Sequence, residues 1–571
     1  MEKVERMNSL KDIIDVSCVK FKDKVAFLEK DLNSTEFKPI KYSTLREDIN
    51  SLGTIMLKKF NLADKKIAVI GENSYRWYVT YMAVACGVGV IVPLDKELPQ
   101  NEIFNLLERS KAECIVYSSR KKELVEGLRD KLSSNVIFIE MNKTESDDVS
   151  FSFDKLLKEG KELLDTGEDT YTKIEIDNER FSVLLFTSGT TASPKGVMLN
   201  HKNLCTNAYS CYYLIPQIGK YTFLSVLPIH HTYEFTIVYI YGISMGATVG
   251  ICEGLKYVNK NFLEIKPDLI TVVPALLEKI NKRIEKAIKE TGKESLINNL
   301  GKFTYNLSKV GIDLRRSLFK KVQNNFGGNL KYMLCGAAPI DKELVNKINS
   351  YGFTFYQGYG ATEASPLITA AITDKAIGTV GKAVYGTEVR IDLSENEDEN
   401  SNIGEIIAKG DNIMMGYYEN EEDTNKSLKK GWYYTGDIGY FDLQGNLVIS
   451  GRTKNIIVTS NGKNIYPEEL ENLINRIPYV EESMVYGMKD EKNSAELIVC
   501  ARVTLDNEYL DDKFGASRPS EEELHSLIWD EIKKINRTLV SYKAIKKLEL
   551  KSDEFQKTTT LKIKRFAEIK K

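Results

Sequence analysis

The chain has 571 residues, a formal net charge of −2 and 28% charged residues. At roughly 100–200 residues per domain, this length predicts several domains. The balanced charge gives no reason to expect nucleic acid as a partner. The eight cysteines are scattered and form no C-x-x-C pair, which argues against a zinc site or disulfide framework and favours a reducing compartment, the cytoplasm. The first residues show no signal-peptide pattern.

Short apolar runs alternate with amphipathic stretches up to about Thr379. The run KIAVI at Lys66–Ile70 predicts a buried strand, and the apolar stretch that follows predicts a helix and another strand. Two longer apolar stretches, Tyr78–Leu94 and Phe235–Ile251, are shorter than the roughly 18–20 residues that a membrane-spanning helix needs. We predict that both are buried helix–strand pairs. The alternation predicts α/β architecture with largely parallel sheets.

The pattern changes after Thr379, where short runs separated by Gly, Asn and Asp predict a small antiparallel β subdomain. A compact α+β unit follows after Arg452. We therefore predict a large N-terminal domain, residues 1–451, made of two α/β subdomains with parallel-rich sheets plus the small β subdomain. Residues 452–571 are predicted to form a small α+β C-terminal domain, in which the polar segment Asp506–Pro519 is a loop.

The segment Leu184–Leu199, LLFTSGTTASPKGVML, carries the strongest local signal. An apolar strand leads into a Thr/Ser/Gly-rich loop that ends at Lys195. Glycines let backbone N–H groups approach phosphate oxygens, hydroxyls add donors, and a lysine adds positive charge. The spacing does not fit the P-loop pattern. On this segment alone, a polar surface loop with a chance lysine remains an equal alternative.

Four further segments follow in order, QGYGATEASP at Gln357–Pro366, YYTGDIGYFD at Tyr433–Asp442, GRTKNIIVTSNGKNIYPEE at Gly451–Glu469, and KTTTLKIKR at Lys557–Arg565. Together with TSGTTASPKG, they resemble the successive signature motifs of the adenylate-forming superfamily. This superfamily includes acyl-CoA synthetases, firefly-type luciferases and nonribosomal adenylation domains. The resemblance spans most of the chain. It implies that a carboxylate and ATP, with Mg²⁺, form an acyl-adenylate and pyrophosphate.

The resemblance also implies a nucleotide site. Tyr359 would stack on the adenine, Glu363 would offer Mg²⁺ a hard oxygen ligand, and Asp437 would accept hydrogen bonds from the ribose hydroxyls. Arg452 resembles the arginine that contacts ribose and phosphate. The full set of implied nucleotide-binding residues is Ser188, Gly189, Thr190, Thr191, Lys195, Gly336, Ala337, Ala338, Gly358, Tyr359, Gly360, Thr362, Asp437 and Arg452.

The catalytic residues that the resemblance implies are Lys562, Thr187, Glu363 and His231. A cation at Lys562 would stabilise the charge that shifts where the substrate carboxylate meets the α-phosphate. Lys564 is the nearest competitor, but the register against the family motif favours Lys562. Leu561 stands where the family usually has glycine, which is a departure from the pattern. The alternative is a solvated lysine in a basic tail.

Lys454 aligns with the hinge of the family, although Asn455 stands where aspartate is frequent. In this family the C-terminal domain is mobile and rotates about the hinge after adenylation, so that one face serves each half-reaction. Gly462 resembles the glycine that lets pantetheine approach the backbone, and Lys463 would contact a phosphate of CoA. The resemblance therefore implies coenzyme A as the acyl acceptor.

The segment Leu227–Glu234, LPIHHTYE, resembles the stretch that lines the acyl pocket, with His231 at the family's His/aromatic position. A histidine beside apolar residues is otherwise more often a packed core residue. The segment contains no aspartate that could pair with an α-amino group, which argues against amino acids. Together with the hinge stretch, it most resembles long-chain fatty-acyl CoA ligases and thus implies a fatty acid substrate.

Two other functions stay open at this point. An acyl-AMP ligase that loads a carrier protein in trans would have the same adenylation residues. A catalytically silent nucleotide-binding regulator should have lost Lys562, Glu363 or Asp437, and all three are present. A luciferase-like oxygenase has no positive support. Peripheral contact of a cytoplasmic protein with a membrane surface is also left open.

Overall fold

The structure is a computed structural model that describes residues 6–31, 34–187, 194–215, 221–290, 292–394, 401–459, 463–489, 497–557 and 563–569. The chain forms two compact units. The first holds the described residues of 1–187, 194–389 and 408–433, and the second holds those of 390–407 and 434–571. The segments 390–407 and 434–451 thus belong with the second unit. The functional domain boundary at 451/452 stays a prediction.

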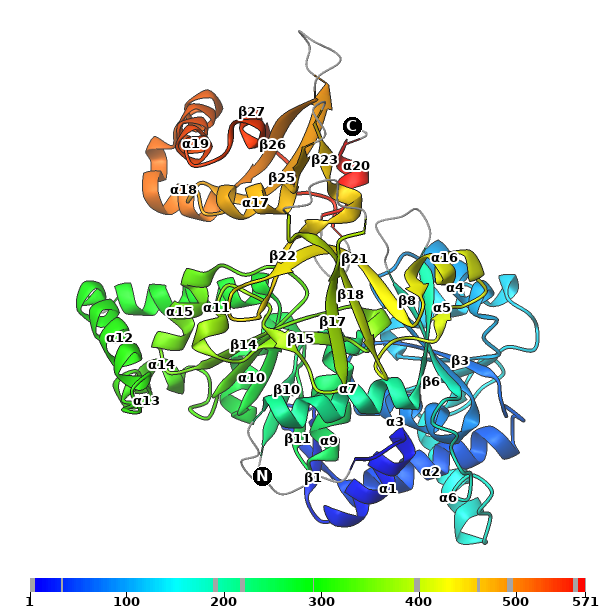
Figure 1. The fold of residues 1–571 in the computed structure, drawn as a ribbon. Coiled ribbons are helices and arrows are strands. Elements are labelled where there is room, and N and C mark those ends of the chain that lie inside the picture. Colours follow the sequence, from blue (N-terminus) through cyan, green and yellow to red (C-terminus); the bar gives the residue numbers. More distant parts are fainter. Residues whose placement is uncertain are drawn as a thin grey trace. The chain divides into compact units, whose positions relative to one another are not determined.

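A nine-stranded sheet, whose central strands are parallel, forms one half of the first unit (Figure 1). Antiparallel strands close both of its edges. In spatial order the strands are β16 (Lys382–Ala383), β15 (Leu367–Ala371), β14 (Thr354–Gly360), β13 (Tyr332–Cys335), β12 (Leu269–Val272), β10 (Thr222–Ser225), β11 (Thr248–Ile251), β1 (Val25–Glu29) and β2 (Lys38–Lys41).

An eight-stranded sheet forms the other half, again with a parallel centre and an antiparallel edge. Its spatial order is β19 (Gly416–Tyr417), β9 (Lys195–Asn200), β8 (Phe181–Thr187), β4 (Val90–Leu94), β3 (Lys66–Ile70), β5 (Cys114–Tyr117), β6 (Ile137–Glu140) and β7 (Phe151–Ser152). The predicted α/β class with two parallel-rich subdomains is confirmed.

Helices connect the strands of both sheets. Those of the first unit are α1 (Leu10–Lys20), α2 (Tyr42–Lys58), α3 (Tyr75–Ala83), α4 (Gln100–Ser110), α5 (Lys122–Glu126), α6 (Phe153–Asp165), α7 (His201–Leu214), α8 (Thr232–Glu234), α9 (Gly242–Ser244), α10 (Val258–Ile265), α11 (Pro274–Lys289), α12 (Glu294–Ser308), α13 (Arg315–Leu318), α14 (Lys320–Asn324), α15 (Lys342–Ser350) and α16 (Glu421–Ser427). Their apolar faces pack on the sheets. For example, Leu277 and Ile284 of α11 share a buried cluster with Ile270 of β12 and Met333 of β13.

The two long apolar stretches are helix–strand pairs, as predicted. The first runs from α3 through a π-helical turn, η1 (Val84–Val88), into β4, and its residues are almost all buried. Gly89 permits the turn, because a Cβ atom there would lie 2.1 Å from the carbonyl oxygen of Lys65. The second runs from η4 (Phe235–Tyr241) through α9 to β11. Among the described residues, no helix is long and apolar enough to cross a membrane.

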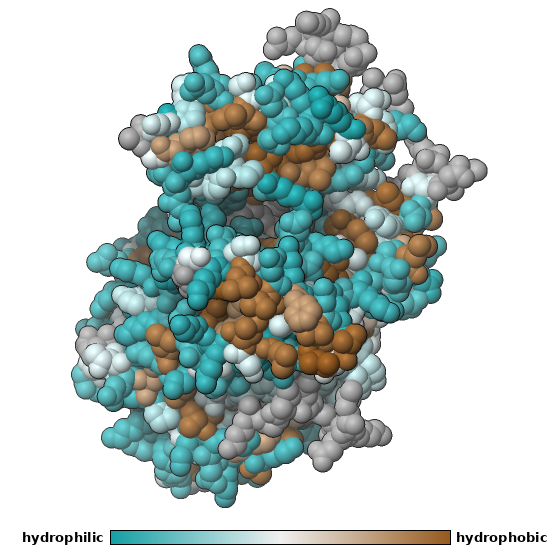
Figure 2. Space-filling model, turned by 90° about the vertical axis from the view of Figure 1, so that its left-hand side faces the viewer, coloured by the Kyte–Doolittle hydropathy of each residue, from teal (hydrophilic) through white to brown (hydrophobic). Residues whose placement is uncertain are grey.

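Helix α12 has two apolar faces. Gly301, Thr304 and Tyr305 are buried on the inner one, whereas Leu296 and Phe303 on the other are 57% and 60% exposed. Figure 2 shows an apolar area, rimmed by hydrophilic residues, on the side of the molecule that carries α12 and α13 in Figure 1. A helix on the surface of a soluble domain ordinarily has one apolar stripe, so the second stripe is unusual.

The described residues of the second unit contribute to two larger sheets and to the two-stranded pair of β23 (Ile457–Val458) and β24 (Asn464–Ile465). In the first, β17 (Thr387–Asp392), β18 (Gly404–Gly410) and β21 (Trp432–Phe441) are neighbours, and β22 (Leu447–Arg452) pairs with β21 in antiparallel fashion. In the other, β26 (Leu497–Leu505) lies between β25 (Val480–Lys489) and β27 (Ile545–Lys551). The remaining helices are α17 (Pro467–Ile474), α18 (Asn507–Phe514), α19 (Glu521–Asn536) and α20 (Arg565–Ile569). Strand β20 (Leu428–Lys429), which pairs with the start of β21, belongs to the first unit. Both the small β part and the α+β part are as predicted.

The segment Asp506–Pro519 is not a loop, and that prediction was wrong. It begins with helix α18, whose N-cap is Asp506. The Asp506 side chain accepts a hydrogen bond from the backbone N–H of Tyr509, at 2.9 Å. Leu510 is fully buried. A capping aspartate and one buried leucine are sufficient for a short helix that packs on its neighbours, although its overall composition is polar.

Candidate active site

Strands β8 and β9 hold the two ends of the Thr/Ser/Gly-rich loop. Thr187 and Lys195 are opposite each other in the antiparallel register, and the Thr187 hydroxyl donates to the Lys195 carbonyl at 3.4 Å. The predicted residues between them, Ser188, Gly189, Thr190 and Thr191, lie outside the described residues. The two strands therefore place a lysine beside the loop, as a phosphate site requires.

The Lys195 ammonium contacts two side chains of the chain's later part. Its Nζ lies 3.0 Å from Oδ2 of Asp423 in α16 and 4.8 Å from the ring centroid of Tyr417. The hydrogen bond from Lys195 is the main influence that lowers the pKa of Asp423. This ion pair and the aromatic ring hold the lysine in place, with its side chain 21% exposed.

Glu363 lies in a 3-10 turn, Thr362–Ala364, directly after β14. Its Oε1 accepts a hydrogen bond of 2.9 Å from the Tyr417 hydroxyl, and its carbonyl accepts one of 2.8 Å from the Met414 N–H. Burial raises the pKa of the Tyr417 phenol, so the hydroxyl stays protonated and donates. The site thus fixes one carboxylate oxygen and leaves the second for a cation.

Glu363 fits a magnesium site of the kind that nucleotides complete. No group of three or more His, Cys, Asp or Glu side chains clusters as a metal cage in the described part of the chain. Mg²⁺ normally binds through one or two carboxylates together with phosphates and water. A single oriented carboxylate near Lys195 matches that pattern.

The predicted nucleotide-binding segment Gly336 to Ala338 packs directly on Tyr233. A Cβ atom at Gly336 would lie 3.3 Å from Cζ of Tyr233, and the Tyr233 hydroxyl donates to the Leu334 carbonyl at 2.7 Å. Ala337 has a φ of 76°, in the left-handed region. Because Tyr233 belongs to LPIHHTYE, the predicted nucleotide-binding segment at Gly336 and the predicted acyl segment are in contact.

The QGYGATEASP turn is equally tight. A Cβ atom at Gly360 would lie 1.9 Å from the Pro366 carbonyl oxygen, so no other residue fits there without movement of the backbone. At Gly358 a Cβ atom would lie 2.7 Å from Cδ1 of Leu367. Tyr359 is 8% exposed, and its stacking on adenine stays a prediction, as does the contact of Thr362 with phosphate.

The acyl segment is anchored by Asn73, which follows β3. The Asn73 amide donates to Ser225 Oγ at 2.9 Å and to the Leu227 carbonyl at 2.7 Å, and its Oδ1 accepts from the Ile229 N–H at 2.9 Å. One side chain of the eight-stranded sheet therefore fixes both the start and the middle of LPIHHTYE. Strand β10 of the nine-stranded sheet leads directly into this segment.

Glu234 also holds this segment in place. It is fully buried, accepts a hydrogen bond of 3.1 Å from the Val226 N–H through Oε1, and accepts the Thr271 hydroxyl through Oε2. Burial raises the pKa of this carboxyl group to about 8, partly offset by these hydrogen bonds. At neutral pH the side chain is thus mostly protonated and acts as a neutral hydrogen-bonding group.

His231 caps the short helix α8, where its carbonyl accepts the Phe235 N–H at 3.0 Å. Its ring centroid lies 4.1 Å from that of His230. Burial, reinforced by the charge of Lys96, lowers the pKa of His230 to about 3, so its ring is neutral although it lies 3.6 Å from Asp95. The predicted pocket histidine therefore has a second, neutral imidazole beside it.

Asp437 and Arg452 form an ion pair in the second unit. They are opposite each other on β21 and β22, and Arg452 Nε lies 2.9 Å from Asp437 Oδ1. The aspartate side chain is 8% exposed and the arginine 44%. The structure thus brings together the two residues that the sequence predicted for ribose and phosphate.

The predicted hinge residue Lys454 is exposed in a 3-10 turn, Thr453–Asn455. The Asn455 amide donates to Glu468 at 2.5 Å. Lys463 is exposed and its N–H donates to Thr459 Oγ1 at 2.9 Å. Gly462, predicted for pantetheine, lies outside the described residues.

The predicted catalytic lysine, Lys562, also lies outside the described residues, but the segments on each side of it are anchored. Lys557 and Ile563 form an antiparallel bridge, and Lys557 Nζ lies 2.7 Å from Glu482. The Arg565 guanidinium pairs with Glu471 of α17 and donates to the Val485 carbonyl at 3.0 Å. The terminal lysine motif is therefore attached to the β25–β27 sheet and α17.

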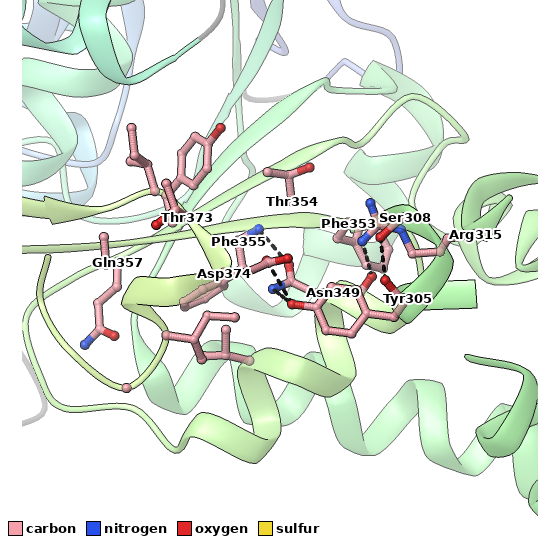
Figure 3. Close-up of a pocket in the computed structure, with 16 residues that line it drawn as sticks. Tyr305, Ser308, Arg315, Asn349, Phe353, Thr354, Phe355, Gln357, Thr373 and Asp374 are labelled. Carbon is pink, nitrogen blue, oxygen red and sulfur yellow. Dashed lines mark hydrogen bonds between the residues drawn. The ribbon is translucent and has the colours of Figure 1, made fainter. Parts of the chain in front are cut away.

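A polar cavity of about 170 Å³ lies at the start of β14 and contains none of the predicted site residues (Figure 3). Tyr305 of α12 points toward Asp374 and donates to its Oδ1 at 2.9 Å. Asn349 of α15 accepts from the Phe355 N–H at 3.0 Å and donates to the Tyr305 hydroxyl at 3.5 Å. This network ties α12 and α15 to β14, the strand that leads into the QGYGATEASP turn.

Several of these anchoring residues were missed at the sequence level. Tyr417, Asp423 and Asn73 belong to no short motif, and their partners are distant in sequence. Tyr233 and Glu234 were quoted within LPIHHTYE, but without a role. The glutamate that ends LPIHHTYE was the one available signal in the sequence.

Comparison with known proteins identifies two adjacent domains. Residues 14–418 match the AMP-binding enzyme family, and residues 454–571 match the AMP-binding enzyme C-terminal domain. The motifs TSGTTASPKG and QGYGATEASP lie within the first match, and KTTTLKIKR lies within the second.

Individual relatives agree with this match. Fatty acyl-CoA synthetase B of Dictyostelium discoideum is 27% identical over 518 residues, which cover 85% of this chain and 75% of that protein. Long-chain-fatty-acid–CoA ligase 5 of Mus musculus is 29% identical over 478 residues, 79% of this chain and 69% of that protein. The anthranilate CoA ligase AuaEII, solved with anthranoyl-AMP, is 18% identical and superposes with a TM-score of 0.78 over 99% of this chain and 98% of the other.

We predict that Tyr417→Phe raises the Mg²⁺ concentration needed for half-maximal pyrophosphate release by about tenfold, because a partner that orients a metal-binding carboxylate typically contributes this much. The measurement is a magnesium titration of ATP-dependent turnover. Tyr418→Phe, which removes the neighbouring hydroxyl but not the bond to Glu363, is the matched control. Equal magnesium requirements in the two variants would show that Tyr417 does not position Glu363.

We also predict that Glu234 makes stability depend on pH. Its ordinary pKa is 4.5 and its folded pKa about 8, so between these values only the folded chain keeps the proton. This stabilisation is complete below pH 4.5 and is lost as pH rises toward 8, at up to about 1.4 kcal/mol per pH unit.

Glu234→Gln keeps the size and the polar contacts without the titration. In urea unfolding between about pH 5.5 and 7.5, the variant should gain at least about 1 kcal/mol relative to wild type as pH rises. Glu343→Gln, an exposed residue of α15, should follow the wild type throughout. A constant difference between Glu234→Gln and wild type would mean that Glu234 is ionised in the folded state.

Proposed function

The chain belongs to the AMP-binding enzyme family, and we propose that it is a fatty-acyl-CoA ligase. In the first half-reaction a fatty acid and ATP form fatty acyl-AMP and pyrophosphate. In the second, coenzyme A takes the acyl group and AMP is released. ATP, Mg²⁺ and CoA are its cosubstrates and cofactor.

The observation that carries the proposal is the connection of Lys195, Tyr417 and Glu363 in the first unit. A lysine at the end of a Gly-rich loop contacts the ring of one tyrosine, and the hydroxyl of the same tyrosine donates to an oriented carboxylate. This arrangement suits a triphosphate, whose negative charge needs both an ammonium group and a divalent cation. An ordinary surface loop with a chance lysine would not require Glu363 to bond to the same tyrosine that the lysine contacts.

The motifs assign a role in the first half-reaction to each of the following residues. Lys195 binds phosphate oxygens, and Asp437 with Arg452 reads the ribose and its phosphate. Mg²⁺, held by Glu363, supplies charge neutralisation on the phosphates. An oxygen of the substrate carboxylate attacks the α-phosphorus, the bond to the β-phosphate bridge breaks, and pyrophosphate leaves with its electron pair. Lys562 stabilises the charge that shifts at that point.

The second half-reaction transfers the acyl group to sulfur. The CoA thiol loses its proton, its sulfur attacks the acyl carbonyl carbon, and AMP leaves as the carbon–oxygen bond to phosphate breaks. Gly462 and Lys463 are the residues proposed to receive the pantetheine arm and a CoA phosphate. Lys454 is proposed as the hinge that exchanges the two faces of the C-terminal domain.

Support for a fatty acid comes from two sources. The Dictyostelium and mouse relatives carry fatty-acid names at 27% and 29% identity. In LPIHHTYE, the neutral His230 and the protonated Glu234 leave no fixed charge that would pair with an amino or second acid group of a substrate. A monocarboxylic acid with an apolar chain suits that environment best.

The experiment that tests the proposal is pyrophosphate release across acetate, aromatic acids and fatty acids of rising length, each with and without CoA. We expect release with fatty acids that turns over continuously with CoA and yields the thioester. Release that stops after one turnover despite CoA would instead indicate a carrier-protein acceptor. Absence of release with every acid would indicate a silent nucleotide-binding protein.

We further predict that Lys562→Ala lowers adenylation at least about a hundredfold, because a placed cation supplies a few kcal/mol to this transition state. Thioester formation from preformed acyl-AMP should be retained, since the lysine serves only the first step. Lys564→Ala is the matched control two residues away. Loss of activity in Lys564→Ala but not in Lys562→Ala would reverse the assignment.

A further inference from the structure

We propose that the outer face of α12 and α13 binds to the surface of a bilayer that contains anionic lipids. The outer face is formed by six apolar side chains that are 45–74% exposed. They are Leu296, Phe303, Val310, Ile312, Leu314 and Leu318.

The outer face is a contiguous feature of the sequence. Leu296, Leu300, Phe303 and Leu307 recur at intervals of four, three and four residues, which places them along one side of α12. The turn that follows adds Val310, the most exposed of the six at 74%. Figure 2 shows the apolar area on this side of the molecule. Exposed apolar areas of this kind usually mark binding surfaces.

The inner face of the same elements is firmly attached. Tyr305 bonds to Asp374, and the Arg315 guanidinium donates to the Asn349 carbonyl at 2.8 Å while it pairs with Asp313. Arg316 donates to the Leu330 carbonyl at 2.7 Å. Since these polar contacts fix the helices, the outer face is a defined surface of the folded unit.

The charge around the outer face complements an anionic surface. Residues 274–325 contain 12 Lys and Arg but five Asp and Glu, a balance of +7 in a chain whose net charge is −2. The two arginines of α13 are used inside the fold. The exposed lysines of this region that flank the apolar residues include Lys302, Lys309, Lys320 and Lys321.

The composition favours lipid over a protein partner. Protein interfaces are enriched in Tyr, Trp and Arg and depleted in Lys. The outer face has the opposite composition, with Leu, Ile, Val and one Phe surrounded by lysines. Apolar side chains that insert at the headgroup boundary, with lysines that reach anionic headgroups, are the recurring means of peripheral membrane binding.

This proposal concerns binding and does not depend on which acid is activated. A fatty acid substrate dissolves in bilayers, so docking there would bring the enzyme to its substrate. Because vesicle binding is measured without turnover, failure of the membrane proposal and failure of the proposed function are separate results.

The test is flotation of the full chain with vesicles of three parts phosphatidylcholine to one part phosphatidylglycerol, and with phosphatidylcholine alone. We expect binding to the anionic vesicles to be at least about tenfold stronger, and to fall when salt rises from about 0.1 M to 0.5 M. The affinity for anionic vesicles should fall at least about tenfold in the triple variant Phe303→Asp/Val310→Asp/Ile312→Asp. Conversion of the four lysines to glutamate should have the same effect.

The matched control is Val19→Asp/Leu443→Asp/Val540→Asp, which makes the same charge change at side chains that are 59%, 101% and 52% exposed elsewhere. It should bind anionic vesicles like the wild type. All variants should keep the wild-type unfolding temperature and the wild-type turnover of a short, water-soluble acid.

Three results would overturn the proposal. The first is absence of wild-type binding to anionic vesicles, and the second is equal loss of binding in the control variant. The third is sedimentation velocity showing a wild-type dimer that Phe303→Asp/Val310→Asp/Ile312→Asp abolishes, together with unchanged vesicle binding. In that case the outer face would bind a second copy of the chain.

Discussion

The hydrogen bond from Tyr417 to Glu363 joins the two large sheets of the first unit at the candidate site. Tyr417 lies in β19 at the edge of the eight-stranded sheet, and Glu363 follows β14 of the nine-stranded sheet. Asn412, just before β19, reinforces the link by donating to the carbonyls of Ala364 and Leu367 at 3.1 and 3.0 Å. Since Lys195 contacts the ring of Tyr417, one side chain contacts both the lysine beside the loop on one sheet and the carboxylate on the other.

The sequence patterns did not predict the contact between Tyr417 and Glu363. Strands such as Lys66–Ile70 and the helices between them could be predicted because periodicity is local. Glycine-rich turns such as the one at Gly360 could be recognised because close backbone approach needs glycine. Tyr417, Asn73 and Asp423 act across sequence separations that no local pattern records. The helix at Asn507–Phe514 was missed for a related reason, since burial of Leu510 outweighs the polar composition of the segment.

The site residues of the second unit, unlike Tyr417, could be predicted from local motifs. Asp437 and Arg452 were predictable as individuals from their motifs, and the antiparallel hairpin explains why they meet. A buried carboxylate is costly unless it is paired and hydrogen-bonded. Arg452 supplies the pairing while it keeps nearly half of its own side chain exposed. The pair is thus stable within its own unit and presents charge at the surface of that unit.

The two faces of helix α12 have different roles. Its inner side contributes Tyr305 to the polar cavity beside β14, and that network explains why the helix is held where it is. It does not explain Leu296, Phe303 or Val310, whose exposure contributes nothing to the fold. Removing these apolar side chains from water would lower the free energy. Their position among lysines is therefore explained by binding to a partner that covers them, and not by the stability of the fold. The inner face serves the site by steadying β14, and the outer face is the surface that we propose binds a bilayer.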